Sequence, residues 1–99
     1  METRARNEMD EVISTMTAMK EISPAIAEAG QLLITTYAKG GKILACGNGG
    51  SAAEAQHLVA EIVGRYEKER APRPAIALST DTSNLTAIGN DYGFDEVFS

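Results

Sequence analysis

A short apolar run at residues 43–46 leads into a glycine-rich turn and then into an alanine-rich segment with helical spacing. The turn contains Gly47, Gly49 and Gly50, which can adopt positive φ values and let a ligand approach the backbone closely. A strand that passes through such a turn into a helix is typical of the anion-binding edge of a parallel α/β sheet. The sequence therefore predicts an α/β domain whose ligand site lies at the carboxyl ends of its strands.

The apolar periodicity predicts six elements in the order helix, helix, strand, helix, strand, helix. The helices are expected at residues 8–21, 24–39 and 51–66, with a short last helix that carries Leu85 and Ile88, and the strands at 43–46 and 75–78. Residues 1–40 thus form an N-terminal α-hairpin, in which Ser23 caps the second helix, Pro24 is its first residue and Gly40 ends it. Residues 42–99 form βαβα units with two buried strands in a parallel sheet.

Composition and charge narrow the class of protein. The 99 residues are 43% hydrophobic, which suits one small globular domain, and the net charge of −5 argues against nucleic acid as a partner. No apolar run approaches the roughly 20 residues that span a bilayer, so no membrane partner is expected. Residues 1–8 lack the apolar core of a secretory signal, and a single cysteine excludes an intrachain disulfide framework. A cytoplasmic location is therefore expected.

A histidine and a glutamate lie four positions apart on the helix that follows the turn. His57 and Glu61 therefore share one helix face, at the spacing used by helical metal ligands. The carboxylate could instead move a proton, and an ordinary surface ion pair is the alternative. Because this helix begins at the glycine turn, we favour a functional pair. Arg65 continues the same face, where it could pair with Glu61 or meet an anionic substrate.

The turn itself has two interpretations. Ser51 is placed to cap the helix or to donate its hydroxyl to a phosphate oxygen, whereas a tight turn without a ligand is the alternative. Gly47, Gly49 and Ala52 also match the G-x-G-x-x-A dinucleotide fingerprint, but no acidic residue ends the second strand and Asp81 comes later. A phosphorylated small molecule is therefore favoured over a nicotinamide cofactor.

A second polar pair follows the last predicted helix. Asn90 and Asp91 could hold sugar hydroxyls at the carboxyl edge of the sheet. They could equally form an ordinary turn with Gly89, because both residue types are common in turns for backbone reasons. Local chemistry leaves the two interpretations even.

Together these motifs resemble the phosphoheptose isomerase family, whose members have the sugar isomerase (SIS) fold. The similarity covers nearly the whole chain, and its blocks are in order and close to the family's spacing. It is carried by residues 46–51, His57, Glu61 and residues 64–66, 74–78 and 89–94. The resemblance implies a parallel sheet with flanking helices.

The resemblance also implies roles for single residues. His57 and Glu61 match zinc ligands, with one zinc ion per subunit, and Glu61 also matches the acid/base that shifts a proton between adjacent carbons. The remaining matches are substrate-binding positions, where Ser51 helps to hold the phosphate: Asn48, Gly49, Gly50, Ser51, Arg65, Asn90 and Asp91.

The implied reaction interconverts D-sedoheptulose 7-phosphate and D-glycero-D-manno-heptose 7-phosphate through an enediol, toward the heptose of bacterial lipopolysaccharide. A homotetramer is implied, and the apolar face with Leu32 and Ile34 agrees with that, although a plain core role is equally compatible. The family's remaining metal ligands, a glutamine and a histidine, belong to a second half that residues 1–99 do not include. We therefore expect these residues to be the N-terminal part of one SIS domain.

Two other functions compete with this one. A regulatory SIS-domain protein that binds the replication initiator would lack catalysis, and the segment 67–78 resembles that class. Such a protein should lack the carboxylate at position 61, which this chain keeps as Glu61. A dinucleotide-binding domain is the weaker alternative, because this chain lacks the acidic residue that such a domain has at the end of its second strand.

Overall fold

The computed structural model describes residues 1–99, which form two compact units, 1–35 and 36–99. Each unit is described by itself. Four α-helices, two strands and three short 3₁₀ helices occur in the order α1 (Glu2–Ala18), η1 (Met19–Ile22), α2 (Ser23–Ala38), β1 (Ile43–Ala45), α3 (Gly50–Val63), β2 (Ala75–Ala77), η2 (Leu78–Thr80), α4 (Thr82–Tyr92) and η3 (Phe94–Glu96).

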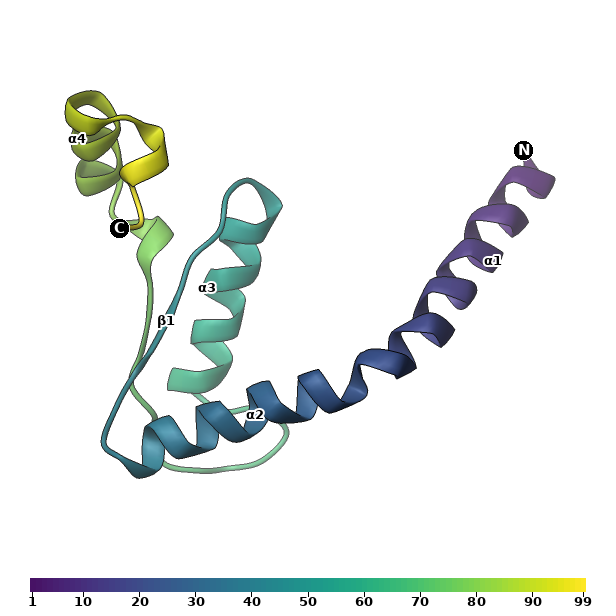
Figure 1. Ribbon diagram of the computed structural model, residues 1–99, viewed down its shortest axis with the longest axis horizontal. Helices are drawn as coiled ribbons and strands as arrows, with labels where there is room; N and C mark the ends of the chain where they lie inside the picture. Colours follow the sequence, from purple (N-terminus) through teal and green to yellow (C-terminus); the bar gives the residue numbers. More distant parts are fainter. The chain divides into compact units, whose positions relative to one another are not determined.

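The predicted N-terminal α-hairpin is wrong, because the backbone stays helical where a reversal was expected. Ala18, Met19 and Ser23 have φ/ψ values of −63/−33°, −61/−19° and −55/−35°. The chain therefore continues from α1 through η1 into α2, as Figure 1 shows. No glycine lies between residues 9 and 29 to supply a positive φ, and the Ser23 N–H bonds to the Lys20 carbonyl in a tighter 3₁₀ turn. Ser23 is thus inside the helical run and is not an N-cap.

The apolar side chains that recur at helical spacing along α1 lie on the surface of its unit. Val12, Ile13 and Met16 are 62%, 62% and 58% exposed, and neither α1 nor α2 contains a buried residue. On α2, Leu32 and Ile34 are likewise exposed. The helix α1 is supported instead by i,i+4 ion pairs between arginine and glutamate side chains.

The predicted glycine stop at the end of α2 is confirmed. Gly40 has φ +76°, and its N–H donates to the Tyr37 carbonyl, while the Gly41 N–H donates to the Thr36 carbonyl. These two bonds form a Schellman motif, which satisfies the last carbonyls of the helix and needs a residue with positive φ.

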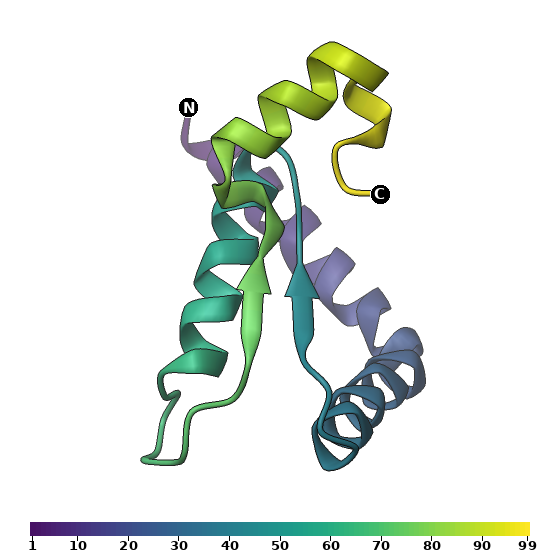
Figure 2. The same ribbon diagram turned by 90° about the vertical axis from the view of Figure 1, so that its left-hand side faces the viewer.

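The two strands form the predicted parallel pair, with α3 as the crossover between them. Leu44 lies beside Ile76 in the register, and both strands point the same way in Figure 2. α3 contacts both strands, and Ala55 on α3 and Ala77 on β2 are buried. Leu44 and Ile76 are 52% and 51% exposed, so the strands are covered on one face only, and the expectation of fully buried strands is wrong.

The last helix runs further than predicted. α4 contains Gly89, Asn90 and Asp91, so the predicted turn at these residues is wrong, and the helix ends instead at Gly93, which has φ +99°. After it, η3 turns back, so that Val97 is buried and its Cγ1 atom lies 3.8 Å from where a Cβ on Gly89 would stand. α4 lies beyond the arrowheads of both strands, at their carboxyl ends (Figure 2).

Candidate active site on helix α3

The glycine turn is tight, and two of its glycines are required by its geometry. Gly49, the residue before α3, has φ +58° and ψ −126°, a conformation that residues with a Cβ rarely adopt. A Cβ on Gly47 would lie 2.5 Å from the Ser51 carbonyl oxygen, whereas one on Gly50 would have nothing within 4 Å. Close packing of the turn against α3, together with the strained φ, explains the glycines at 47 and 49.

Ser51 lies in the first turn of α3 and does not cap it. Its amide donates to the Asn48 carbonyl and the Ala52 amide donates to the Gly49 carbonyl, each at 3.1 Å. No side chain caps the helix, so the capping role predicted for Ser51 is wrong. The side chain of Ser51 is exposed at the positive end of the helix dipole, where an anion is favoured. Its contact with a phosphate stays a prediction.

The histidine and glutamate form the predicted pair. The Nε2 atom of His57 lies 3.1 Å from Oε1 of Glu61. The side chain of His57 is 77% exposed and that of Glu61 is 36% exposed. Both are far along the helix from Ser51, which precedes Glu61 by ten positions, or about 15 Å of helical rise.

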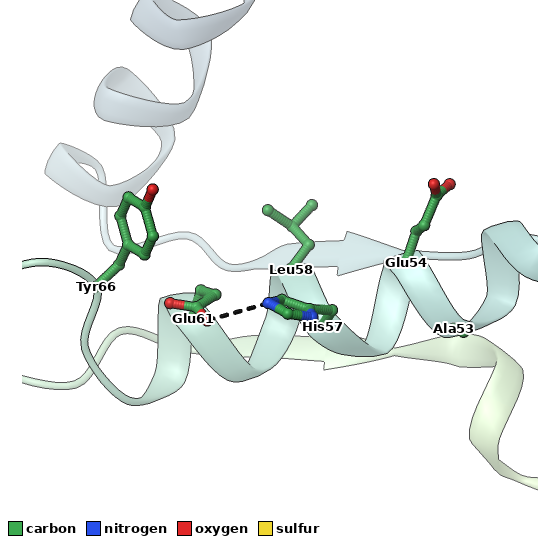
Figure 3. Close-up of a pocket in the computed structure, with 6 residues that line it drawn as sticks. All are labelled: Ala53, Glu54, His57, Leu58, Glu61 and Tyr66. Carbon is green, nitrogen blue, oxygen red and sulfur yellow. Dashed lines mark hydrogen bonds and ion pairs between the residues drawn. The ribbon is translucent and has the colours of Figure 1, made fainter. Parts of the chain in front are cut away.

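The pair lines a pocket of about 590 Å³, a size that small-molecule sites commonly have. Figure 3 shows Glu61 and His57 joined along one side of α3, with the ring of Tyr66 standing beyond the end of the helix. Sequence reasoning assigned a role in the site to only two of the lining residues, His57 and Glu61. The helical spacing of positions 54, 57, 58 and 61 could have identified one shared face. The lining residues are Ala53, Glu54, His57, Leu58, Glu61 and Tyr66.

Arg65 is not on the face where it was expected. α3 ends at Val63, and Gly64 has φ −83° and ψ −117°, so Arg65 no longer follows the helical spacing. Its guanidinium pairs with Glu69 instead of Glu61, and it does not line the pocket. The prediction that Arg65 continues the His57 face is therefore wrong. Its contact with substrate stays a prediction.

Asn90 and Asp91 lie on α4, away from the pocket of α3. Asn90 Nδ2 donates to Asp91 Oδ1 at 3.1 Å, and both residues are exposed in the last turns of the helix. Neither lines the pocket beside Glu61. Asn48, Gly49 and Gly50 do not line it either, so the structure brings together only two of the predicted site residues, His57 and Glu61.

The donor atoms of His57 and Glu61 fit one edge of a zinc site. Imidazole nitrogen and carboxylate oxygen are usual zinc ligands, and bonds of about 2.1 Å at tetrahedral angles separate ligand atoms by roughly 3.4 Å. The 3.1 Å between Nε2 and Oε1 is close to that separation. Residues 1–99 contain no group of three or more histidine, cysteine, aspartate or glutamate side chains that could hold a metal ion. The two side chains alone are fewer than the ligands that a zinc site needs, and zinc binding stays a prediction.

The acidic residue nearest the second strand is already engaged. Asp81 is the N-cap of α4, where Oδ1 accepts from the Asn84 amide at 3.0 Å and Oδ2 accepts from Asn84 Nδ2 at 2.8 Å. A dinucleotide site would need a carboxylate that can accept from ribose hydroxyls at this edge. The structure therefore gives the dinucleotide interpretation no support.

The parallel strands, the glycine turn and the His57–Glu61 helix define the class of protein. The SIS domain model matches residues 8–99, and the chain belongs to the SIS domain family. The resemblance to phosphoheptose isomerases and the α/β fold class are confirmed by the relatives and by a solved structure. No helix is long and apolar enough to cross a membrane.

Three relatives illustrate the similarity. The phosphoheptose isomerase of Rhodospirillum rubrum is 62% identical over 79 residues, which cover 80% of this chain and 42% of the relative. That of Helicobacter hepaticus is 52% identical over 99 residues, which cover all of this chain and 50% of the relative. The solved structure of phosphoheptose isomerase from Neisseria gonorrhoeae matches 98% of this chain and 50% of its own, at 46% identity and a TM-score of 0.81. The chain thus spans about half the length of these relatives.

Proposed function

We propose that these residues are part of an isomerase that interconverts D-sedoheptulose 7-phosphate and D-glycero-D-manno-heptose 7-phosphate. The observation that carries the proposal is the His57–Glu61 pair in a pocket on the helix that starts at the glycine turn. The names of the relatives support it, because they are phosphoheptose isomerases at 52–64% identity.

Isomerisation of an aldose and a ketose through an enediol needs one base near two adjacent carbons. Glu61 is half-buried in the pocket, and its carboxylate can remove a proton from the carbon beside the carbonyl. The base returns that proton to the neighbouring carbon, and a second proton moves from the hydroxyl oxygen of the first carbon to the former carbonyl oxygen, so the isomerisation involves no net change in atoms. The positive end of α3, with Asn48, Gly49, Gly50 and the Ser51 hydroxyl, would bind the phosphate at the far end of the substrate.

Zinc is part of the proposal, with His57 and Glu61 as two of its ligands. The separation of their donor atoms supports it, and no third histidine, cysteine, aspartate or glutamate side chain of residues 1–99 is grouped with them. When bound, such an ion polarises a carbonyl oxygen and stabilises the negative charge of an enediol. Arg65, Asn90 and Asp91 are proposed to contact the sugar or its phosphate from the flanking segments.

The same proposal includes an oligomeric state, a cellular location and a biosynthetic role. The exposed apolar side chains of α1 and α2 support a homotetramer in which these helices are covered by partner subunits. A cytoplasmic location and a role toward the heptose of lipopolysaccharide agree with the proposed substrate.

The decisive test is Glu61→Gln in the full-length protein, assayed with sedoheptulose 7-phosphate in D₂O. The wild type should form the aldose and incorporate deuterium at the carbon that receives the proton, and Glu61→Gln should abolish both. Glu54→Gln, on the same pocket wall but without a hydrogen-bond partner there, should keep most of the activity. Full activity in Glu61→Gln would overturn the proposed base. A folded wild type without isomerisation would favour the regulatory alternative.

A further inference from the structure

Arg70 is bound to the end of the helix that carries Glu61. Its Nη2 atom donates to the Glu61 carbonyl at 2.6 Å and its Nη1 atom donates to the Ile62 carbonyl at 2.9 Å. Nη1 also donates to the Ala71 carbonyl at 3.2 Å. The side chain is half-buried, so these bonds are partly shielded from water. The guanidinium thus holds two consecutive backbone carbonyls of the last turn of α3.

These carbonyls need a donor because the helix stops early. The Gly64 N–H donates to the Ala60 carbonyl at 2.9 Å, but the backbone departs from helical values at Gly64 itself. The carbonyls of Glu61 and Ile62 therefore lose the amides that a longer helix would offer. A cation at the negative end of the helix is also favoured by the helix dipole. The planar fork of arginine can serve both carbonyls at once, which a lysine ammonium cannot do in the same way.

The segment between the helix and Arg70 is folded to bring the guanidinium back. Glu67 has φ +59°, the only positive value at a non-glycine residue in the chain. The Lys68 N–H donates to the Tyr66 carbonyl at 2.7 Å, which closes a tight reversal. A strained residue in an exposed loop persists only when its surroundings hold it, and the Arg70 contacts are the ones that close this loop onto α3.

We infer that Arg70 is a positioning residue for Glu61, which fixes the backbone from which the proposed base projects. This inference rests on the proposed function. Glu61 has one hydrogen-bonding partner for its side chain, the exposed His57, so its direction depends on the last turn of α3. Arg70 itself does not line the pocket. A proton transfer depends on sub-ångström placement of the base, so release of this turn should slow the chemical step more than substrate binding.

The test compares Arg70→Met and Arg70→Lys with Arg73→Met in the full-length protein. Arg73 belongs to the same connection but stacks over the Tyr37 ring, 5.5 Å from its centroid, and no hydrogen bond joins it to α3. Arg70→Met should lower kcat by about 10- to 100-fold with KM changed by less than about twofold. Arg70→Lys should recover part of that loss, and Arg73→Met should keep the wild-type kcat.

A double-mutant cycle shows whether Arg70 acts through Glu61. Adding Arg70→Met to Glu61→Asp, which keeps a carboxylate, should lower kcat by a smaller factor than Arg70→Met does in the wild type, because the shorter side chain is already displaced from the position that Arg70 fixes. An additive loss in the double variant would overturn the inference, as would a wild-type kcat in Arg70→Met. If Arg70→Met does not fold, the kcat of Arg70→Lys becomes the test, because lysine keeps the positive charge but lacks the planar guanidinium that donates to both carbonyls.

Hydrogen exchange separates this inference from the proposed function. In Arg70→Met, the amides of residues 60–66 should exchange faster, while those at the start of α3 should not change. Unchanged hydrogen exchange at residues 60–66 in Arg70→Met would show that Arg70 does not hold the end of α3, whatever the isomerase activity of the variant. A wild type without isomerase activity would overturn the proposed function, and with it the role of Arg70 in catalysis. Faster exchange would then still support Arg70 as the residue that holds the end of α3.

Discussion

The Nε2 atom of His57 lies 3.1 Å from Oε1 of Glu61, one turn along α3, yet the two side chains are 77% and 36% exposed. The imidazole is therefore at the rim of the pocket and the carboxylate is deeper, beside Tyr66 (Figure 3). Such an arrangement suits a histidine that holds and orients the carboxylate from the solvent side. Oε1 of Glu61 has His57 as its hydrogen-bonding partner, whereas the second carboxylate oxygen, Oε2, has no hydrogen-bonding partner in the protein.

Removal of the imidazole should weaken zinc binding. In His57→Asn we expect the affinity of the full-length protein for zinc to fall by about 100-fold, because one ligand of the proposed site is lost. Competition with a chelator of known affinity measures this directly and does not depend on turnover. Glu54→Gln is the matched control, since that carboxylate lines the same pocket but forms no hydrogen bond or ion pair with His57. Equal affinities for wild type and His57→Asn would contradict zinc ligation by this residue.

A methyl group at Gly47 should disrupt the turn at the start of α3. Its carbon would lie 2.5 Å from the Ser51 carbonyl oxygen and 2.8 Å from the Ser51 Cβ, distances that backbone atoms must relieve by moving. We expect Gly47→Ala to lower the free energy of unfolding by about 1–3 kcal/mol, as overpacking does. Urea denaturation monitored by circular dichroism gives the value.

Gly50 offers the comparison for that variant. A Cβ there would meet nothing within 4 Å, and the residue begins α3. Alanine at a helical position is favoured over glycine by about 0.5–1 kcal/mol, so Gly50→Ala should leave the stability unchanged or raise it. Similar destabilisation in both variants would show that the clash of an added Cβ at position 47 is not the cause of the lost stability.

The part of the site that the sequence predicts well is local in the chain. The strand, the glycine turn and the i,i+4 spacing of His57 and Glu61 lie within about twenty residues, and backbone chemistry alone links them. The position of Arg65 was not predictable in this way, because α3 ends at Val63, three residues sooner than the apolar pattern suggests. The Arg70 contacts span eight and nine positions and leave no periodic signal.

The fold shows the same division between local and non-local information. Glycines that must have positive φ, such as Gly40, were placed correctly, whereas Asn90 and Asp91 were assigned to a turn although α4 continues through them to Gly93. A Gly-Asn-Asp sequence favours a turn by propensity, but packing of α4 against the segment around Val97 overrides it. The exposure of Leu44 and Ile76 was also unpredictable, since an apolar strand does not reveal which of its faces is covered.

The side chain of Tyr37 joins the last turn of α2 to the start of β2. Its hydroxyl donates to the Pro74 carbonyl at 3.1 Å, and the same carbonyl accepts from the Ile43 amide at 3.1 Å. Tyr37→Phe removes one of the two donors and should lower stability by about 1 kcal/mol. Thermal unfolding measures the loss, and Tyr92→Phe, at a residue that is 77% exposed, serves as its control. No difference between the two variants would mean that the Pro74 carbonyl is satisfied without Tyr37.

The N-cap of α4 provides a last prediction, in which the effect of the capping hydrogen bond can be separated from the effect of the negative charge. Asp81 accepts from the Asn84 amide at 3.0 Å and from Asn84 Nδ2 at 2.8 Å. Asp81→Ala removes the acceptor and should cost about 1 kcal/mol of stability, whereas Asp81→Asn keeps an oxygen that can cap the helix and should cost less. Denaturant unfolding of the three proteins gives this ranking. If Asp81→Ala and Asp81→Asn are equally destabilised, charge at the start of the helix matters more than the hydrogen bond to the Asn84 amide.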